Sequence, residues 1–112
     1  MTPRRGEIWW VSLDPTIGSE VAKTRPCVVV GRDLVNEYRR TVVVIPLSSS
    51  PSPFPPIRVK MRCGERDAVA VVDQIRAVSK ERLKERIGSA TPEEMRAISQ
   101  ALGQILELDE SN

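Results

Sequence analysis

Two short stretches of the chain carry residues suited to chemistry on a phosphate. Arg25 precedes the apolar run 26–30, and Ser48 follows the run 41–47; both runs are short and rich in valine. Such runs predict buried strands rather than helices. If the two strands pair antiparallel, Arg25 and Ser48 fall at the same edge of the sheet. A permanent cation beside a hydroxyl, both on rigid elements, suits the binding of a phosphate group.

Cleavage of RNA by its own neighbouring 2′-hydroxyl is a reaction that this pair can support, because the reaction needs no nucleophile from the protein. It needs stabilisation of the charge that develops at phosphorus, and proton transfers at the attacking and leaving oxygens. Arg25 can donate two parallel hydrogen bonds to phosphate oxygens, and an arginine keeps its proton, so charge stabilisation suits it better than the role of base. Ser48 can hydrogen-bond the same phosphate or relay a proton, and the base is left unassigned. By spacing alone, such residues at strand ends more often have purely structural roles.

The chain contains no histidine and two widely separated cysteines, Cys27 and Cys63. The lack of histidine excludes a His-based zinc site, a Ser-His-Asp triad and a pair of histidines for RNA cleavage. Cys27 lies inside an apolar run and is interpreted as a core residue, and no disulfide is expected. The sequence therefore predicts a site without a metal ion or a cofactor.

Length and composition predict a single domain over residues 1–112, with 40% hydrophobic and 29% charged residues. No apolar stretch approaches the ~20 residues of a membrane span, and the first residues lack the apolar core of a signal peptide. We therefore expect a cytoplasmic protein that does not bind membranes. Residues 1–66 carry 11 basic and 6 acidic groups, a balance of +5, whereas residues 67–112 carry 6 and 9, a balance of −3. The basic first part is compatible with a nucleic-acid partner or simply with a solvated mixed surface.

Short apolar or alternating segments predict further strands. Trp9 and Trp10 must point to opposite faces of the first strand, so one ring is expected in the core and the other at an interface or against a ligand. One continuous strand within 68–78 is expected to place Gln74 and Arg76 on the same face. The predicted strands comprise the two runs above and residues 6–13, 57–61, 68–78 and 83–89.

Polar, Pro-rich or Gly-rich segments predict the connections between strands. The segment 14–24 is long for a hairpin connection, and it is either a lid or binding loop or a simple surface excursion. Residues 32–40 are expected to form a second polar connection, and residues 48–56 a Ser/Pro-rich loop. Residues 79–82 are expected to form a single helical turn.

One helix is predicted at the end of the chain. Thr91 is the expected N-cap, followed by Pro92 at the first helical position and by Glu94, which completes a capping box. An apolar stripe on the helix is expected to pack on the core, and residues 109–112 are expected to fray. The stripe consists of Met95, Ile98, Leu102, Ile105 and Leu106. Many short strands and one final helix predict a mainly β fold, a small, strongly bent sheet or barrel with a docked helix.

Several motifs together resemble the MazF/PemK toxins, the sequence-specific endoribonucleases of bacterial type II toxin–antitoxin systems. The most specific part is a Gly-Ser-Glu loop at 18–20 followed by Arg-Pro at 25–26. The resemblance spans nearly the whole chain in order. Its other segments are Arg5 to Val11, Leu13 to Thr16, Pro46 to Ser49, Glu65 to Asp67 and Val72 to Arg76.

The resemblance implies an SH3-like barrel, similar to the plasmid toxin CcdB, that works as a homodimer with RNA at the subunit interface. It implies metal-independent cleavage of single-stranded mRNA that leaves a 2′,3′-cyclic phosphate and a 5′-hydroxyl and that inhibits translation and growth. The catalytic arginine falls on Arg25 and the catalytic hydroxyl on Ser48, a position that is commonly Thr in the family. The implied RNA contacts are Ser19, Glu20, Gln74 and Arg76. The loop after Asp14 would be a mobile flap, and a MazE-like antitoxin would occupy the RNA groove.

Two alternatives remain open at this point. The same fold can serve as a non-catalytic binding module, for example one that binds gyrase as CcdB does. Serine has no methyl group to restrict its side-chain torsion, so the hydroxyl of Ser48 is less fixed than that of a threonine. The second alternative is therefore a family member with weak catalytic activity, whose main role is to bind RNA or antitoxin.

Overall fold

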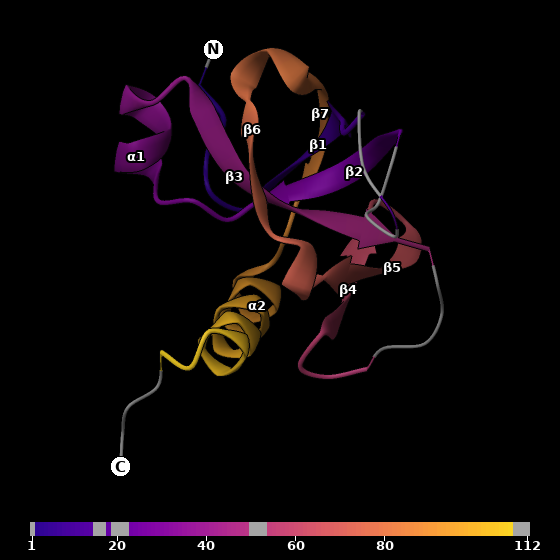
Figure 1. Ribbon diagram of the computed structural model, residues 1–112. Coiled ribbons are helices and arrows are strands. Elements are labelled where there is room, and N and C mark those ends of the chain that lie inside the picture. Colours follow the sequence, from indigo (N-terminus) through magenta and orange to yellow (C-terminus); the bar gives the residue numbers. More distant parts are fainter. Residues whose placement is uncertain (1, 15–17, 19–22, 50–53, 109–112) are drawn as a thin grey trace.

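The computed structural model describes residues 2–14, 18, 23–49 and 54–108 of the chain. These residues form a curled β-sheet with a long C-terminal helix on one side and a short helix at the opposite end (Figure 1). In chain order the elements are β1 (Glu7–Ser12), β2 (Thr24–Val29), α1 (Asp33–Tyr38), β3 (Thr41–Ser48), β4 (Arg58–Cys63), β5 (Arg66–Val71), the 3-10 helix η1 (Val72–Gln74), β6 (Arg76–Ser79), the 3-10 helix η2 (Lys80–Arg82), β7 (Leu83–Ser89) and α2 (Pro92–Ile105).

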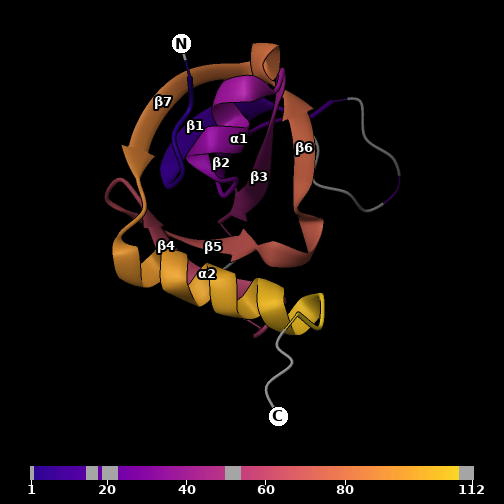
Figure 2. The ribbon, with the colours of Figure 1, turned by 90° about the vertical axis from the view of Figure 1, so that its left-hand side faces the viewer.

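The strands form one antiparallel sheet that branches at β3. Its order is β4-β5-β3-β2-β1-β7, and β6 pairs separately with β3. The first half of β3 pairs with β6, whereas its end, at Leu47 and Ser48, pairs with β5. Because β3 changes partner along its length, the sheet curls into a partly open barrel, and Figure 2 shows β7 and β6 on opposite sides of β1, β2 and β3. The predicted bent sheet with a docked C-terminal helix is confirmed.

Each face of the curled sheet has its own apolar core, because successive side chains of a strand point to opposite faces. One core combines Leu13, which directly follows β1, with residues of β1, β2, β3, β6 and β7: Trp9, Val11, Cys27, Val29, Val42, Val44, Val78 and Leu83. On the other face, α2 covers a second core and adds Ile98 and Ala101 to residues of β1 to β5. The two cores fix the register of β1, β2 and β3, since a one-residue slip would exchange their faces.

The predicted start of α2 is confirmed. The amide of Glu94 donates to Oγ1 of Thr91 at 3.1 Å, and the amide of Thr91 donates to Oε1 of Glu94 at 2.8 Å. Leu106 was expected in the apolar stripe, but it lies past the last helical turn and is mostly exposed. The predicted helical turn at 79–82 is also confirmed as η2, which Ser79 caps through its side chain.

Two predictions about the middle of the chain are wrong. The segment 32–40 contains the helix α1, whose residue Asn36 is buried and donates from Nδ2 to the Gly31 carbonyl at 3.0 Å. The expected continuous strand over 68–78 is interrupted by η1, where the Ile75 amide donates to the Val72 carbonyl at 3.2 Å. The interruption follows from the curl of the sheet, because the chain must leave its pairing with β4 before it can join β3 as β6.

None of the helices within the described ranges is long and apolar enough to cross a membrane. The predicted fraying of residues 109–112 falls outside the described residues.

Candidate active site

A cleft of about 600 Å³ opens where the ends of β2 and β3 meet the turn of the β4–β5 hairpin. Its walls combine apolar side chains with cationic and hydroxyl groups, a mixture typical of ligand clefts. The lining residues are Trp10, Thr24, Arg25, Pro26, Leu47, Ser48, Ser49, Cys63, Gly64, Arg66, Asp67, Ala68 and Ile87.

The structure places Arg25 and Ser48 together on the wall of this cleft. Strands β2 and β3 run antiparallel, with Cys27 opposite Pro46. From this pair, Arg25 lies two positions away along β2 and Ser48 two positions away along β3, so both residues stand at the same end of the strand pair. Arg25 is exposed and Ser48 is half-buried. The two residues therefore lie at one edge of the sheet, as antiparallel pairing of their strands predicts.

The β4–β5 turn brings a second cation and a carboxylate into the cleft. Arg66 and Asp67 both line it, and Nη1 of Arg62 lies 2.9 Å from Oδ1 of Asp67. Neither Arg66 nor Asp67 was predicted as a site residue. The signal was the Glu65–Asp67 motif of the family resemblance, but no local pattern links this turn to the end of β3. Only the pairing of β5 with the last residues of β3 makes them neighbours.

The base of the loop that follows β1 is held by several polar contacts. The Leu13 amide donates to the Lys23 carbonyl at 2.9 Å, and the Lys23 amide donates to Oδ1 of Asp14 at 2.8 Å. Lys23 has a positive φ of 68°, which a side chain other than glycine adopts rarely and at a cost. Nη1 of Arg82 donates to the Ser12 carbonyl at 3.1 Å and also to that of Asp14. These contacts fix the strand ends from which Arg25 projects.

The other predicted RNA contacts lie elsewhere or outside the described residues. Ser19 and Glu20 lie outside the residues that the structure describes. Gln74 is half-buried in η1, and Arg76 donates from Nη1 to the Leu13 carbonyl at 3.4 Å. Neither Gln74 nor Arg76 is among the residues that line the cleft. The position of Arg76 instead adds it to the contacts at the base of the loop.

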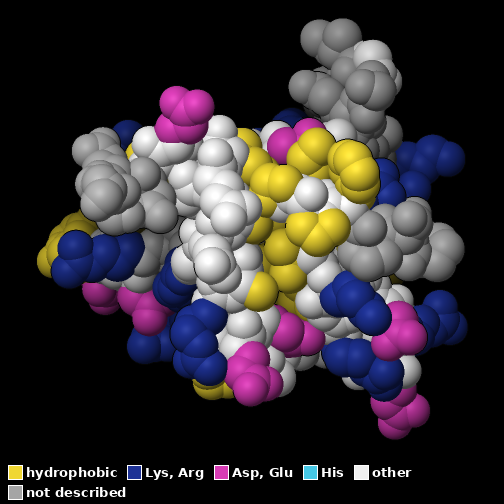
Figure 3. Space-filling model, turned by 90° about the horizontal axis from the view of Figure 1, so that it is seen from below, with side chains coloured by type: hydrophobic (Ala, Val, Ile, Leu, Met, Phe, Trp, Pro, Cys, Tyr) yellow, Lys and Arg dark blue, Asp and Glu magenta, His cyan; other side chains and the backbone are white. Residues whose placement is uncertain are grey.

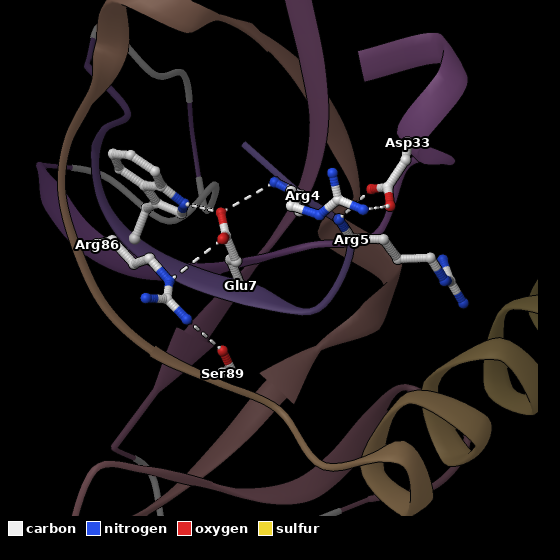
Figure 4. Close-up of polar contacts among 7 residues, drawn as sticks. Arg4, Arg5, Glu7, Asp33, Arg86 and Ser89 are labelled. Atoms are coloured by element: carbon white, nitrogen blue, oxygen red, sulfur yellow. Dashed lines mark hydrogen bonds and ion pairs between the residues drawn. The ribbon is translucent and has the colours of Figure 1, made fainter. Parts of the chain in front are cut away.

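The two tryptophans of β1 differ in exposure, and a polar network holds the buried one, Trp9. Nε1 of Trp9 donates to Oε1 of Glu7 at 3.0 Å, which satisfies its N–H inside the core. Figure 4 shows Glu7 between Arg4 and Arg86, and Nε of Arg86 lies 3.3 Å from Oε2 of Glu7. Trp10, one residue on, points to the other face and opens onto the cleft. The prediction that the two rings lie on opposite faces is confirmed.

The two thiols have different surroundings. Burial raises the pKa of Cys27 to about 12, and the nearby Arg76 opposes this effect only in part. Its predicted place in the core is confirmed, since the side chain is fully buried. Partial burial also raises the pKa of Cys63, which lines the cleft, and Arg66 lowers it in part. Across the ranges that the structure covers, there is no cluster of three or more His, Cys, Asp or Glu side chains that could hold a metal ion.

A second hollow of about 520 Å³ lies between α2 and β4. Its lining includes Pro55, Pro56, Val59, Ala97 and Ala101. Figure 3 shows that apolar side chains gather on this side of the molecule. The hollow does not share lining residues with the cleft that holds Arg25 and Ser48.

Comparison with known proteins gives one consistent family. A sequence model of the family described as PemK-like, MazF-like toxin of type II toxin-antitoxin system matches residues 4–106. The endoribonuclease MazF9 of Mycobacterium tuberculosis is 36% identical, and the match covers 94% of this chain and 97% of that protein. The endoribonuclease EndoA of Bacillus subtilis is 32% identical, and the match covers 91% of this chain and 92% of that protein.

Solved structures share the fold. The crystal structure of MazF from Deinococcus radiodurans matches with a TM-score of 0.85 at 22% identity, covering 96% of this chain and 98% of that one. A mycobacterial endoribonuclease in complex with its cognate antitoxin matches with a TM-score of 0.81 at 24% identity, and the match covers 97% of this chain and 99% of that one. The expectation of a MazF-like barrel with a C-terminal helix is thereby confirmed.

Proposed function

The chain belongs to the family of PemK-like, MazF-like toxins of type II toxin-antitoxin systems, and from this premise we propose that it is an endoribonuclease that cleaves single-stranded mRNA. The observation that carries the proposal is the placement of Arg25 and Ser48 on the wall of one cleft. Cutting messages inhibits translation and arrests growth, which is the expected toxic effect.

Arg25 supplies the positive charge that the reaction needs. When the 2′-hydroxyl attacks the adjacent phosphorus, negative charge builds up on the phosphate oxygens. The exposed guanidinium of Arg25 can donate two parallel hydrogen bonds to these oxygens, and such charge-assisted bonds strengthen as the charge develops. In this proposal the 2′-hydroxyl gives its proton to solvent water, and the 5′-oxygen leaves as the 2′,3′-cyclic phosphate closes. The leaving oxygen takes a proton from the guanidinium of Arg25, which regains one from solvent. Arg66 adds a second cation to the cleft for the neighbouring backbone phosphate.

In this proposal Ser48 contacts the same phosphate from the end of β3, the strand next to the one that carries Arg25. Ser48 is half-buried, and its hydroxyl can donate to a phosphate oxygen or relay a proton. This arrangement uses neither a protein nucleophile nor a bound ion. A threonine in this position would be stiffer, because the added methyl restricts the χ1 torsion.

Partners follow from the family and from the chemistry of the cleft. We propose that a MazE-like antitoxin with an acidic inhibitory segment blocks the cleft by competing with RNA for Arg25 and Arg66. We also propose that the toxin acts in the cytoplasm, where its mRNA substrate is, and that it works as a homodimer. Size-exclusion chromatography with light scattering tests the dimer, for which a mass near 25 kDa is expected from a chain of 12.5 kDa.

Cleavage of a long single-stranded transcript in EDTA tests the proposed function. We expect wild-type protein to cut at a small set of sequences with chelator present, and Arg25→Ala to make no cuts. Arg96→Ala is the matched control, because it removes an equal charge from an exposed position on α2, away from the cleft. Absence of cuts by the wild type on varied transcripts would contradict the proposal, as would cuts that EDTA abolishes.

A separate pair of variants tests the hydroxyl. Ser48→Ala is expected to slow cleavage at least tenfold, and Ser48→Thr is expected to keep or raise the rate. Equal cleavage rates for Ser48→Ala and wild type, measured at saturating RNA, would show that the hydroxyl of Ser48 has no catalytic role.

A further inference from the structure

Trp10 is a large apolar side chain that the fold leaves open to the cleft. It is 37% exposed, whereas its neighbour Trp9 is 4% exposed. Aromatic rings bury a large apolar area when they enter a core, so an indole left open forgoes stabilisation that Trp9 gains. Two other exposed aromatic residues of the described surface, Tyr38 and Phe54, do not line this cleft. The exposure of Trp10 therefore coincides with the candidate site.

The strand register places the indole beside the residues assigned to the phosphate. Trp10 pairs across β1 and β2 with Pro26, the residue that follows Arg25. On β3, Leu47 precedes Ser48 and lines the same cleft, and Ile87 of β7 completes this apolar side. An aromatic and aliphatic surface thus adjoins the guanidinium and the hydroxyl.

This combination matches the chemistry of a nucleotide. A nucleobase has flat apolar faces, and its backbone carries an anionic phosphate a few bonds away. Proteins that bind single-stranded RNA stack unpaired bases on aromatic rings while cations hold the backbone. The cleft volume, about 600 Å³, lies in the usual range for small-ligand sites.

We propose that Trp10 forms a nucleobase subsite, in which its ring stacks on a base adjacent to the phosphate held by Arg25. The assignment rests on the proposed ribonuclease function and adds a base-binding residue to it. Trp10 has no role in the proton transfers, and it acts by binding and positioning the RNA. Loss of the ring therefore weakens RNA binding without removing the catalytic groups.

Fluorine NMR on the wild-type protein reports the contact directly. Protein labelled with 5-fluorotryptophan gives two signals, because the chain has two tryptophans, and Trp10→Phe identifies one of them. The probe is a 2′-O-methyl oligoribonucleotide with the sequence around a mapped cut, which binds but cannot be cleaved. We expect the Trp10 signal to shift on saturation with this probe and the buried Trp9 signal to stay unchanged.

Binding of the same probe to variants gives the energetic test. Trp10→Leu is expected to raise Kd by about 5- to 150-fold, the range for loss of one stacked base, and Trp10→Phe by less than about threefold. Tyr38→Leu, a change at an exposed aromatic residue outside the cleft, is the matched control and should leave Kd unchanged. An abasic nucleotide at the stacked position should weaken binding to wild type but not to Trp10→Leu.

The outcomes separate the subsite from the function. Normal cleavage together with an unchanged Kd for Trp10→Leu, or a Trp10 signal that RNA does not shift, would overturn the subsite and leave the ribonuclease in place. A Trp10→Leu protein that changes its oligomeric state but keeps its RNA affinity would assign the ring to a subunit interface instead. Wild-type protein that cuts no RNA would overturn the function and the subsite with it.

Discussion

Replacing Arg82 by alanine removes contacts that hold the end of β1 next to the start of β2, and we predict a loss of both stability and cleavage rate. Its guanidinium donates to the carbonyls of Ser12 and Asp14, the first at 3.1 Å. Ser12 pairs with Thr24, the residue before Arg25, so the anchored backbone lies directly beside the end of β2 that carries Arg25. No feature of the cleft itself is removed by this change.

The size of the effect follows from the contacts that are lost. A hydrogen bond to a charged group contributes about 1.5–3 kcal/mol when buried. Arg82 is half-buried and Asp14 is exposed, so solvent weakens both bonds, and we expect about 1–2 kcal/mol in total. For a domain of this size that corresponds to a fall in Tm of about 4–8 °C. If the whole loss falls on the orientation of Arg25, the population of competent sites drops by up to about 5- to 30-fold.

Three measurements check this prediction. Thermal unfolding gives the change in Tm, single-turnover cleavage at saturating RNA gives the rate, and hydrogen exchange reports the Lys23 amide, which donates to Asp14. We expect a lower Tm, a lower cleavage rate constant and faster exchange of the Lys23 amide. Arg96→Ala is the control for the lost charge. Equal Tm, rate and exchange for Arg82→Ala and Arg96→Ala would refute the reasoning.

Three further predictions concern other parts of the molecule. Mass spectrometry after treatment with iodoacetamide should show that Cys63 reacts more slowly than a model thiol at pH 8, because its raised pKa leaves less thiolate, and that the reaction speeds up as the pH rises. Bound RNA should protect Cys63, and Cys27, with a pKa of about 12, should not react in the folded protein. Thr91→Ala should lower stability by about 1 kcal/mol in urea unfolding, because the capping box of α2 loses its acceptor, whereas Thr91→Ser should not. Gly31→Ala should destabilise the fold by about 1–3 kcal/mol in the same assay, since a Cβ there would lie 2.7 Å from Oδ1 of the buried Asn36; a loss under 0.5 kcal/mol would show that Asn36 moves aside.

Local patterns in the sequence were sufficient for most strands, for the capped helix and for the edge that holds Arg25 and Ser48. Those features depend on alternation, turn residues and antiparallel pairing of neighbours in the chain. The helix α1 was missed because it has six residues, too few for a helical period to stand out, and because its apolar side chains Leu34, Val35 and Tyr38 face solvent instead of a core. Its one fully buried side chain is the amide of Asn36.

The composition of the cleft depends on contacts between distant segments. Arg66 and Asp67 enter it because β5 pairs with the end of β3, and Ile87 enters it because β7 pairs with β1. A single sequence does not show which strand lies beside which. The contact between the guanidinium of Arg76 and the Leu13 carbonyl likewise joins segments that are far apart in the sequence.

Cleavage of an oligoribonucleotide with one 2′-deoxy sugar tests the central claim most directly, that RNA is cut by its own hydroxyl while Arg25 and Ser48 stabilise the phosphate. The single substitution is placed on the 5′ side of a mapped cut, and the reaction is run in EDTA. We predict that the all-ribose oligonucleotide yields 2′,3′-cyclic phosphate and 5′-hydroxyl ends, and that the substituted one binds equally well but stays intact. Cleavage of the substituted oligonucleotide at the normal rate would contradict the account, because it would require a water or protein nucleophile.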